Sequence, residues 1–174
     1  MSASVISIAE WRAARRVPAE PAWAPAEQPP SLRLVTADGP DLVCLQEVRK
    51  MNRQAALRFE RWPELPQADF LAPEGYTAVY ETNAVTRHGE HGNALLTRWP
   101  VLGTTHQDIS DHRFEQRGLL HVVIDVEGRR VHAIVVHLGL IKGSRVRQIA
   151  RLREFIDREV PPGEAVVVAG EACD

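Results

Sequence analysis

Asp41-Leu42-Val43-Cys44-Leu45-Gln46-Glu47-Val48 is the stretch that decides the fold. Its apolar run predicts a buried strand, and the run ends in a Gln-Glu pair that presents a carboxylate at the strand end. Three later segments repeat this pattern, namely Gly92 to Arg98, Val131 to Leu138 and Ala165 to Glu171. Strand-like and helix-like stretches alternate through the body of the chain. The fold class is therefore α/β or α+β, a layered sandwich with mixed sheets.

The order and spacing of these segments resemble the endonuclease/exonuclease/phosphatase superfamily of DNase I-like metal-dependent phosphoesterases, from about Leu32 to the last residue. The resemblance implies a DNase I-like layered β-sandwich with flanking helices. It also implies a Mg²⁺-dependent phosphodiesterase or phosphatase, with Mn²⁺ as the alternative cation. The implied substrate is a phosphoester: nucleic acid, a phospholipid headgroup or a small phosphoester.

The resemblance assigns roles to single residues. Glu47 matches the family's metal-binding Glu, and Glu171 stands where the family has the Asp of Gly-Asp-x-Asn. His137 matches a histidine that donates hydrogen bonds to the scissile phosphate. Asn93 matches a Gly-Asn pair at the active-site rim. A structural role stays open for each, because a solvated carboxylate, a core histidine and a turn-stabilising Asn are all common.

Phosphate oxygens need positive partners, and two arginines lie beside the matched segments. Arg117 precedes the strand from Leu119, and Arg145 follows His137. A solvated helix face explains such arginines as well. The histidines His88, His91, His106 and His112 form a poor zinc signal, since their spacing is irregular and no cysteine lies near them. Ser110-Asp111-His112 repeats the family's C-terminal catalytic letters out of order, so we expect a chance occurrence.

The chain departs from the family at both ends. Family members carry an Asn at the end of the first strand, whereas Leu32 to Thr36 is followed at once by the four residues Ala37 to Pro40. The terminal motif reads Gly170-Glu171-Ala172-Cys173, and no Asp-His pair follows it. We therefore expect a partial domain whose hydrolase activity is impaired or lost. A non-catalytic remnant or binding domain of the same fold is the alternative.

One consequence follows without the family. Two parallel neighbouring strands need a crossover of about a dozen residues or more, and residues 37–40 cannot provide it. Leu32 to Thr36 therefore cannot pair in parallel beside Leu42 to Gln46.

Composition limits the remaining choices. With 21 Lys+Arg against 23 Asp+Glu among 174 residues, the formal charge of −2 excludes a global basic field. The 2 cysteines form no disulfide framework, which favours a reducing compartment. No apolar run approaches the ~20 residues needed to span a bilayer, so we expect a cytoplasmic protein without an obligate protein partner.

Local patterns predict the elements. Residues 1–30 are expected to be a Pro/Ala-rich disordered tail with a marginal helix from Ser4 to Arg16, and residues 31–174 the domain. Glu127-Gly128 predicts a hairpin turn. Arg145 to Val160 predicts an amphipathic helix lying on a sheet, because its apolar residues recur at helical spacing, namely Val146, Ile149, Leu152, Ile156 and Val160. The apolar run Val166 to Ala169 predicts a strand covered on both faces. The predicted strands are Leu32 to Thr36, Leu42 to Gln46, Tyr76 to Tyr80, Asn93 to Arg98, Leu119 to Asp125, Arg130 to Leu138 and Ala165 to Ala169.

Overall fold

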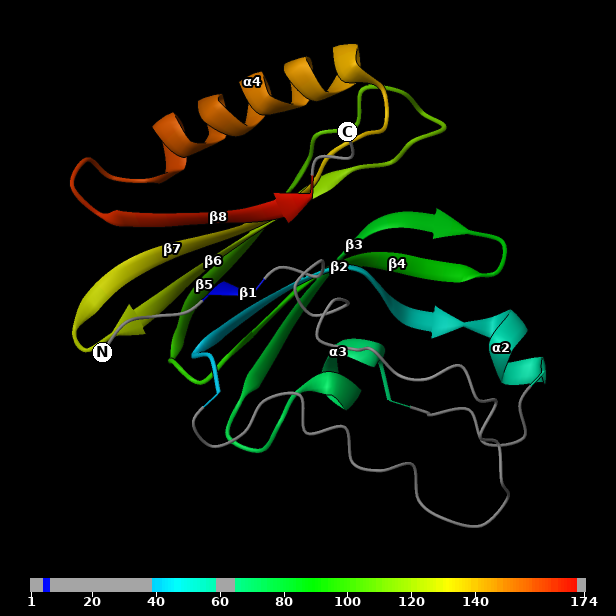
Figure 1. Cartoon of the computed structure of the whole chain (residues 1–174), viewed down its shortest axis with the longest axis horizontal. Coiled ribbons are helices and arrows are strands. Elements are labelled where there is room, and N and C mark those ends of the chain that lie inside the picture. Colours follow the sequence, from blue (N-terminus) through cyan, green and yellow to red (C-terminus); the bar gives the residue numbers. More distant parts are fainter. Residues whose placement is uncertain (1–4, 7–38, 59–64, 172–174) are drawn as a thin grey trace.

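The computed structural model describes residues 5–6, 39–58 and 65–171 of the chain (Figure 1). No helix in these ranges is long and apolar enough to cross a membrane. The elements follow in the order β1 (Val5–Ile6), β2 (Leu42–Asn52), α2 (Arg53–Arg58), α3 (Gln67–Leu71), β3 (Thr77–Thr86), β4 (Gly89–Thr97), β5 (Val101–Asp108), β6 (Gly118–Val126), β7 (Arg129–His137), α4 (Lys142–Glu159) and β8 (Ala165–Glu171).

Two four-stranded sheets carry these elements, one with the order β1-β2-β4-β3 and the other with the order β5-β6-β7-β8. In the first sheet β4 pairs antiparallel with both β2 and β3. In the second sheet β6 pairs antiparallel with β5 and β7, and β8 joins β7 in parallel. Helix α4 is the crossover that such a parallel pair requires.

Three apolar cores stack these elements into layers, with α3 outside the first sheet and α4 outside the second (Figure 1). The layered α+β sandwich with flanking helices that the sequence predicts is thus confirmed. The core between the sheets contains Leu42, Cys44, Leu95, Leu120, Val122, Ile124, Ala133 and Val135. The core under α3 contains Val43, Leu45, Val48, Ala68, Ala94 and Leu96, and the core under α4 contains Ile109, Leu119, Ile134, Val136, Leu138 and Phe155.

The alternation predicted for β7 is confirmed. Ala133 and Val135 lie in the core between the sheets, whereas Ile134 and Val136 lie in the core under α4. Because side chains alternate along a strand, His137 falls on the face between the sheets. Its side chain is buried there, with 6% exposed.

The predicted turn at Glu127-Gly128 is also confirmed. It joins β6 to β7, and both residues have positive φ, 55° and 81° respectively. This is the backbone that a two-residue hairpin turn demands, and glycine adopts it without a steric cost.

Helix α4 exists as predicted, and Leu152 and Ile156 of its predicted apolar face pack against the core under it, but the prediction is wrong for Val146 and Ile149. It begins at Lys142, three residues before the predicted start, and its fully buried side chains are Ser144, Gln148 and Phe155. Val146 and Ile149, which the apolar spacing assigned to the sheet, are 61% and 51% exposed. The helix is turned so that Ser144 and Gln148 reach hydrogen-bond partners, Asp111 Oδ2 at 2.8 Å and the Gly139 N–H at 2.8 Å.

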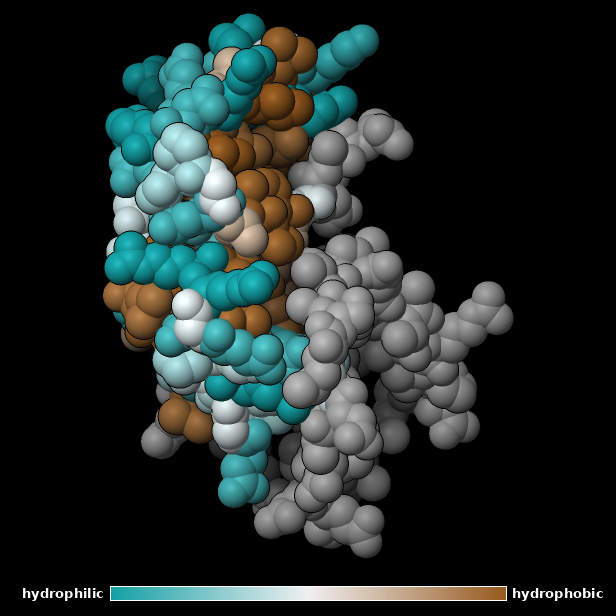
Figure 2. All heavy atoms as spheres, turned by 90° about the vertical axis from the view of Figure 1, so that its left-hand side faces the viewer, coloured by the Kyte–Doolittle hydropathy of each residue, from teal (hydrophilic) through white to brown (hydrophobic). Residues whose placement is uncertain are grey.

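The prediction that β8 is covered on both faces is wrong for one face. Val166 and Val168 are 41% and 44% exposed, while Ala169 packs toward the core between the sheets. Viewed from the side of the β6–β7 hairpin, apolar side chains form a strip down this side of the molecule (Figure 2). A run of valines predicts a strand, but it does not predict whether one or both faces of that strand are covered by other elements.

The N-terminal region differs from the prediction where it is described. Val5–Ile6 forms strand β1, which pairs in parallel with Leu42–Val43, so the helix predicted from Ser4 is wrong at these two residues and they belong to the sheet. The connection over residues 7–41 is long enough for a parallel crossover. The rest of the predicted tail and Leu32 to Thr36 lie outside the described residues.

Besides β1, three elements were not predicted: β5, α2 and α3. Strand β5 consists largely of polar and small residues and is half-exposed, so it carries little hydrophobic signal. The two helices have six and five residues, which is too short to show a periodic pattern.

Candidate active site

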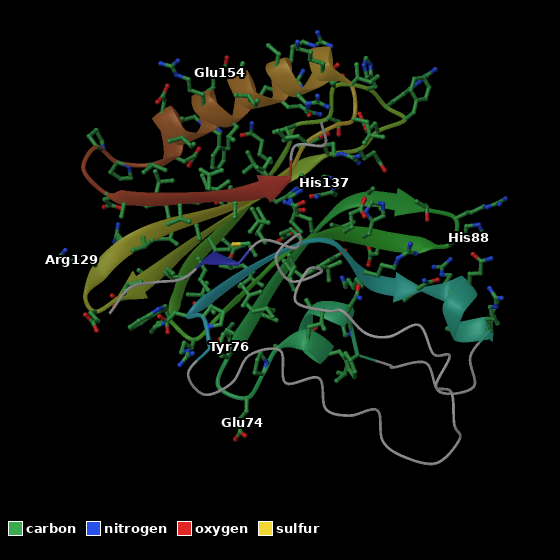
Figure 3. The ribbon with its side chains drawn as sticks, viewed as in Figure 1. Glu74, Tyr76, His88, Arg129, His137 and Glu154 are labelled. Carbon is green, nitrogen blue, oxygen red and sulfur yellow. The ribbon has the colours of Figure 1, made fainter. Side chains whose placement is uncertain are left out.

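Two strands of the second sheet, β7 and β8, end beside the middle of β2. The prediction that the Gln-Glu pair ends a strand is wrong, because β2 continues through Gln46 and Glu47 to Asn52 in its pairing with β4. The Gln46 side chain of β2 donates a hydrogen bond from Nε2 to the Val136 carbonyl of β7 at 2.8 Å. The next residue on β7 is His137, and its register partner on β8 is Glu171. His137 lies between the sheets, at the opposite end of β7 from Arg129 (Figure 3). The structure therefore brings the Gln-Glu pair inside β2 next to the end of β7 at His137, with β8 paired beside β7.

Glu47 occupies an irregular point of β2. The β2–β4 register shifts between Leu45 and Val48, and Glu47 has a φ of 54°. A left-handed backbone is uncommon for a residue other than glycine and costs about 1–3 kcal/mol. The side chain is exposed, and within the described ranges its carboxylate has no hydrogen-bond partner. The bulge thus turns this carboxylate out of the ladder toward solvent.

His91 is a site residue that the sequence reasoning missed. It pairs with Arg49 across the β2–β4 ladder, two positions beyond the bulge, and is half-buried. Burial holds its pKa below the ordinary value; Glu47 opposes this shift, and Arg49 and Arg117 add to it. The charges of Glu47 and Arg117 thus act on His91 in opposite directions. The signal available in the sequence was the position of His91 directly before the matched Gly92-Asn93.

Asn93 is fully buried and joins the two sheets. Its Nδ2 donates to the Gly118 carbonyl at 2.9 Å and to the Val135 carbonyl at 3.0 Å. Its Oδ1 is buried without a partner among the described residues. The preceding Gly92 lies so close to the Glu81 carbonyl oxygen that a Cβ atom would overlap it. The Gly-Asn pair therefore fixes the spacing of β4 against its neighbouring strands, and Asn93 lies beneath the surface, not at an exposed rim.

The two predicted phosphate arginines hold a loop. Arg117 donates from Nε to the Leu138 carbonyl at 3.2 Å, and its Nη2 lies 3.2 Å from Glu115 Oε1. Arg145 donates from Nη1 to the Leu140 carbonyl at 2.6 Å. Arg117 and Arg145 therefore both bind carbonyl oxygens of the loop after β7, Arg117 from the loop before β6 and Arg145 from the first turn of α4.

Asp111 is engaged on the other side of this loop. Arg147 binds both of its carboxylate oxygens, at 2.7 and 2.6 Å, and Ser144 Oγ donates to Oδ2 at 2.8 Å. These hydrogen bonds hold the pKa of Asp111 well below its ordinary value. The carboxylate therefore attaches the loop to α4, which agrees with treating the Ser-Asp-His letters as a chance occurrence.

The donor set suits magnesium better than zinc. Within residues 5–6, 39–58 and 65–171, no group of three or more His, Cys, Asp or Glu residues could hold a metal ion. Zinc sites need three or four such protein ligands, whereas magnesium is held by one or two carboxylates together with waters and substrate phosphate. Glu47 presents one exposed carboxylate at the bulge.

Comparisons with known proteins agree with this architecture. A sequence profile of the Endonuclease/Exonuclease/phosphatase family matches residues 31–170. The protein YbhP of Escherichia coli (strain K12), described as uncharacterized, is 39% identical over 147 residues, which are 83% of this chain and 56% of YbhP. The chain thus spans little more than half the length of that relative.

Solved structures show the same fold at low identity. An endonuclease/exonuclease/phosphatase family protein from Leptotrichia buccalis superposes with a TM-score of 0.55 and 14% identity, over 75% of this chain and 53% of that protein. Sphingomyelinase C from Streptomyces griseocarneus superposes with a TM-score of 0.54 and 21% identity, over 76% of this chain and 51% of that protein.

Proposed function

The chain belongs to the endonuclease/exonuclease/phosphatase family, and on that premise we propose that it carries part of a Mg²⁺-dependent phosphoester hydrolase site with Glu47 as the metal ligand. Mn²⁺ is the alternative cation. The proposed substrate class is a phosphodiester or phosphomonoester. The family includes phosphoesterases, and sphingomyelinase C is among the structural relatives.

Each residue of the site has one task in this proposal. Glu47 holds the cation, and Glu171 supplies a second carboxylate from β8. When bound, magnesium neutralises charge on the phosphoryl oxygens and lowers the pKa of a water. His137 donates a hydrogen bond to a phosphate oxygen, and Arg117 places positive charge beside it. Asn93 acts as a positioning residue that keeps β4 at a fixed distance from β6 and β7.

The observation that carries the proposal is the bulge at Glu47. A left-handed non-glycine residue persists only where the surrounding structure maintains it, and such residues cluster at functional sites. Here the neighbouring Gln46 is attached to Val136 and thereby to the strand of His137. The strained residue therefore directly follows the side chain that attaches β2 to the strand of His137.

Metal binding tests the proposal directly. We expect Mn²⁺ to broaden the NMR resonances of residues near Glu47 and His137, and Mg²⁺ to compete with it. Glu47→Gln keeps the shape of the side chain and should abolish the broadening. Glu74→Gln is the matched control, because Glu74 is an exposed carboxylate in the turn before β3, far from His137 (Figure 3). Broadening that survives Glu47→Gln would exclude Glu47 as the ligand.

Activity is expected at or near background in this chain. Positioned groups act as a unit, and removing one typically costs about 10² to 10³ in rate. Glu171 extends the family's Asp by one methylene, and Cys173 lacks the family's carboxamide. We expect Glu171→Asp with Cys173→Asn alone not to restore hydrolysis of bis-p-nitrophenyl phosphate. Turnover by the unaltered chain that EDTA and Glu47→Ala both abolish would overturn the impairment and support the hydrolase.

A further inference from the structure

Two loops beside the site carry exposed apolar side chains. Phe114, between β5 and β6, is 87% exposed, and Leu140 and Ile141, between β7 and α4, are 65% and 57% exposed. Exposed basic residues adjoin them in the sequence, Arg113 on the first loop and Lys142 on the second. We call these five residues the docking rim.

Hydrogen bonds hold the two loops together. The Leu140 N–H donates to Oε1 of Glu115 at 2.9 Å, and Glu115 is the residue directly after Phe114 in the chain. Arg117 donates to the Leu138 carbonyl at 3.2 Å, and Arg145 to the Leu140 carbonyl at 2.6 Å. The two connections lie at the same end of the second sheet (Figure 1). Their apolar side chains are therefore presented outward by an ordered scaffold.

The strand register places the rim at the same end as the site. Asp108, at the end of β5, pairs with Gly118 at the start of β6, and the rim loop joins them. Leu119 pairs with Val136, the residue before His137. The opposite end of the sheet carries the β6–β7 turn with Arg129, together with Leu102 of β5. Only the rim end can meet a surface that also faces the site.

The local charge of the rim is positive. Arg113 lies with its guanidinium 5.6 Å from the centre of the Phe114 ring. The nearby carboxylates are already paired, Glu115 with Arg117 and Asp111 with Arg147. Arg113 and Lys142 thus remain as exposed cations in a chain whose formal net charge is −2.

We propose that the docking rim binds the surface of an anionic phospholipid bilayer as a peripheral contact. Two of its three apolar side chains are aliphatic, and these insert among lipid headgroups but give a nucleic-acid base no aromatic face to stack on. The two cations complement anionic headgroups, each contributing about fivefold in affinity at moderate salt. This contact goes beyond the proposed hydrolysis and does not require the site to be active.

Vesicle co-sedimentation of the full chain tests the proposal. We expect binding to phosphatidylcholine vesicles that contain phosphatidylglycerol, and weaker binding to phosphatidylcholine alone or at high salt. The double variant Leu140→Ser with Ile141→Ser should lower binding at least about tenfold, and adding Phe114→Ser to it should lower binding by a similar factor again. Arg113→Gln should lower it about fivefold.

Matched variants at the far end of the sheet complete the experiment. Leu102→Ser and Arg129→Gln change residues of comparable exposure and should leave binding unchanged. Circular dichroism checks that every variant is folded. Absence of binding to anionic vesicles, or equal losses in these controls, would overturn the proposal. Binding of single-stranded DNA that depends on Phe114 but not on the two aliphatic residues would overturn it in favour of base stacking.

Discussion

Replacing Asn93 by alanine should destabilise the fold, because Asn93 holds the two sheets together at the site. The change removes two hydrogen bonds, to Gly118 and Val135, from a side chain that is fully buried. Each contributes about 0.5–1.5 kcal/mol, and the small cavity adds to the loss. We expect the free energy of unfolding to fall by about 2–3 kcal/mol. For a chain of this size that lowers Tm by about 4–12 °C.

Urea and thermal denaturation followed by circular dichroism measure this loss. Asn83→Ala is the matched control, since Asn83 is half-buried and its Oδ1 makes a single side-chain contact, 3.1 Å from His106 Nε2. We expect the control to lose less than about 1 kcal/mol. Asn93→Asp should be no better than alanine at neutral pH, because a carboxylate has no N–H to donate. Equal and small losses of unfolding free energy in all three variants would refute the inference that Asn93 holds the two sheets together, and would leave Asn93 with a role at the substrate only.

Three further predictions concern other parts of the fold. His121 Nε2 lies 2.8 Å from His132 Nδ1, and the His132 ring also contacts Glu164 at 2.6 Å. Burial lowers the pKa of His121. The stability that neutral His121 contributes to the fold is therefore present above pH 6.5 and is lost as the pH falls below 6.5. The urea midpoint of the unaltered chain should therefore drop more steeply in acid than that of His121→Leu. Phe155→Ala removes a fully buried ring from the core under α4 and should lower the free energy of unfolding by about 3–5 kcal/mol, as measured by denaturant unfolding. A loss under about 1 kcal/mol would contradict this prediction. The Glu47→Gly variant should have a free energy of unfolding about 1 kcal/mol higher than that of Glu47→Ala, since only glycine adopts the left-handed backbone without strain. Comparison of the two Tm values measures this difference. Equal stability would mean that the bulge is not strained.

The predictions that succeeded rest on local chemistry. The alternation along β7 predicted which of its residues face the neighbouring sheet, because successive side chains of any strand point to opposite faces. The Glu127-Gly128 turn follows from the same kind of rule, since few residues accept a positive φ. The parallel neighbour of β2 in the structure is Val5–Ile6, whereas Leu32 to Thr36 lie outside the described residues, so their exclusion stays a prediction.

The predictions that failed concern how an element is oriented. Apolar spacing put Val146 and Ile149 against the sheet, yet α4 buries Ser144 and Gln148, because these meet polar partners on neighbouring loops. The spacing of apolar residues along a helix predicts that one face is apolar, but it does not predict how the helix is rotated against the sheet and the neighbouring loops. The polar strand β5 was missed for a related reason: its place is secured by pairing with β6, not by its own hydrophobicity.

The candidate site divides in the same way. The sequence by itself determined the family, the layered fold and the choice of Glu47 and His137, since residue identity and order along the chain are enough for these. Only the tertiary structure revealed that Glu47 sits on a strained bulge, that Asn93 is a buried clamp and that His91 joins the site. Burial, backbone strain and contacts between distant strands arise when the sheets pack, and no local pattern encodes them.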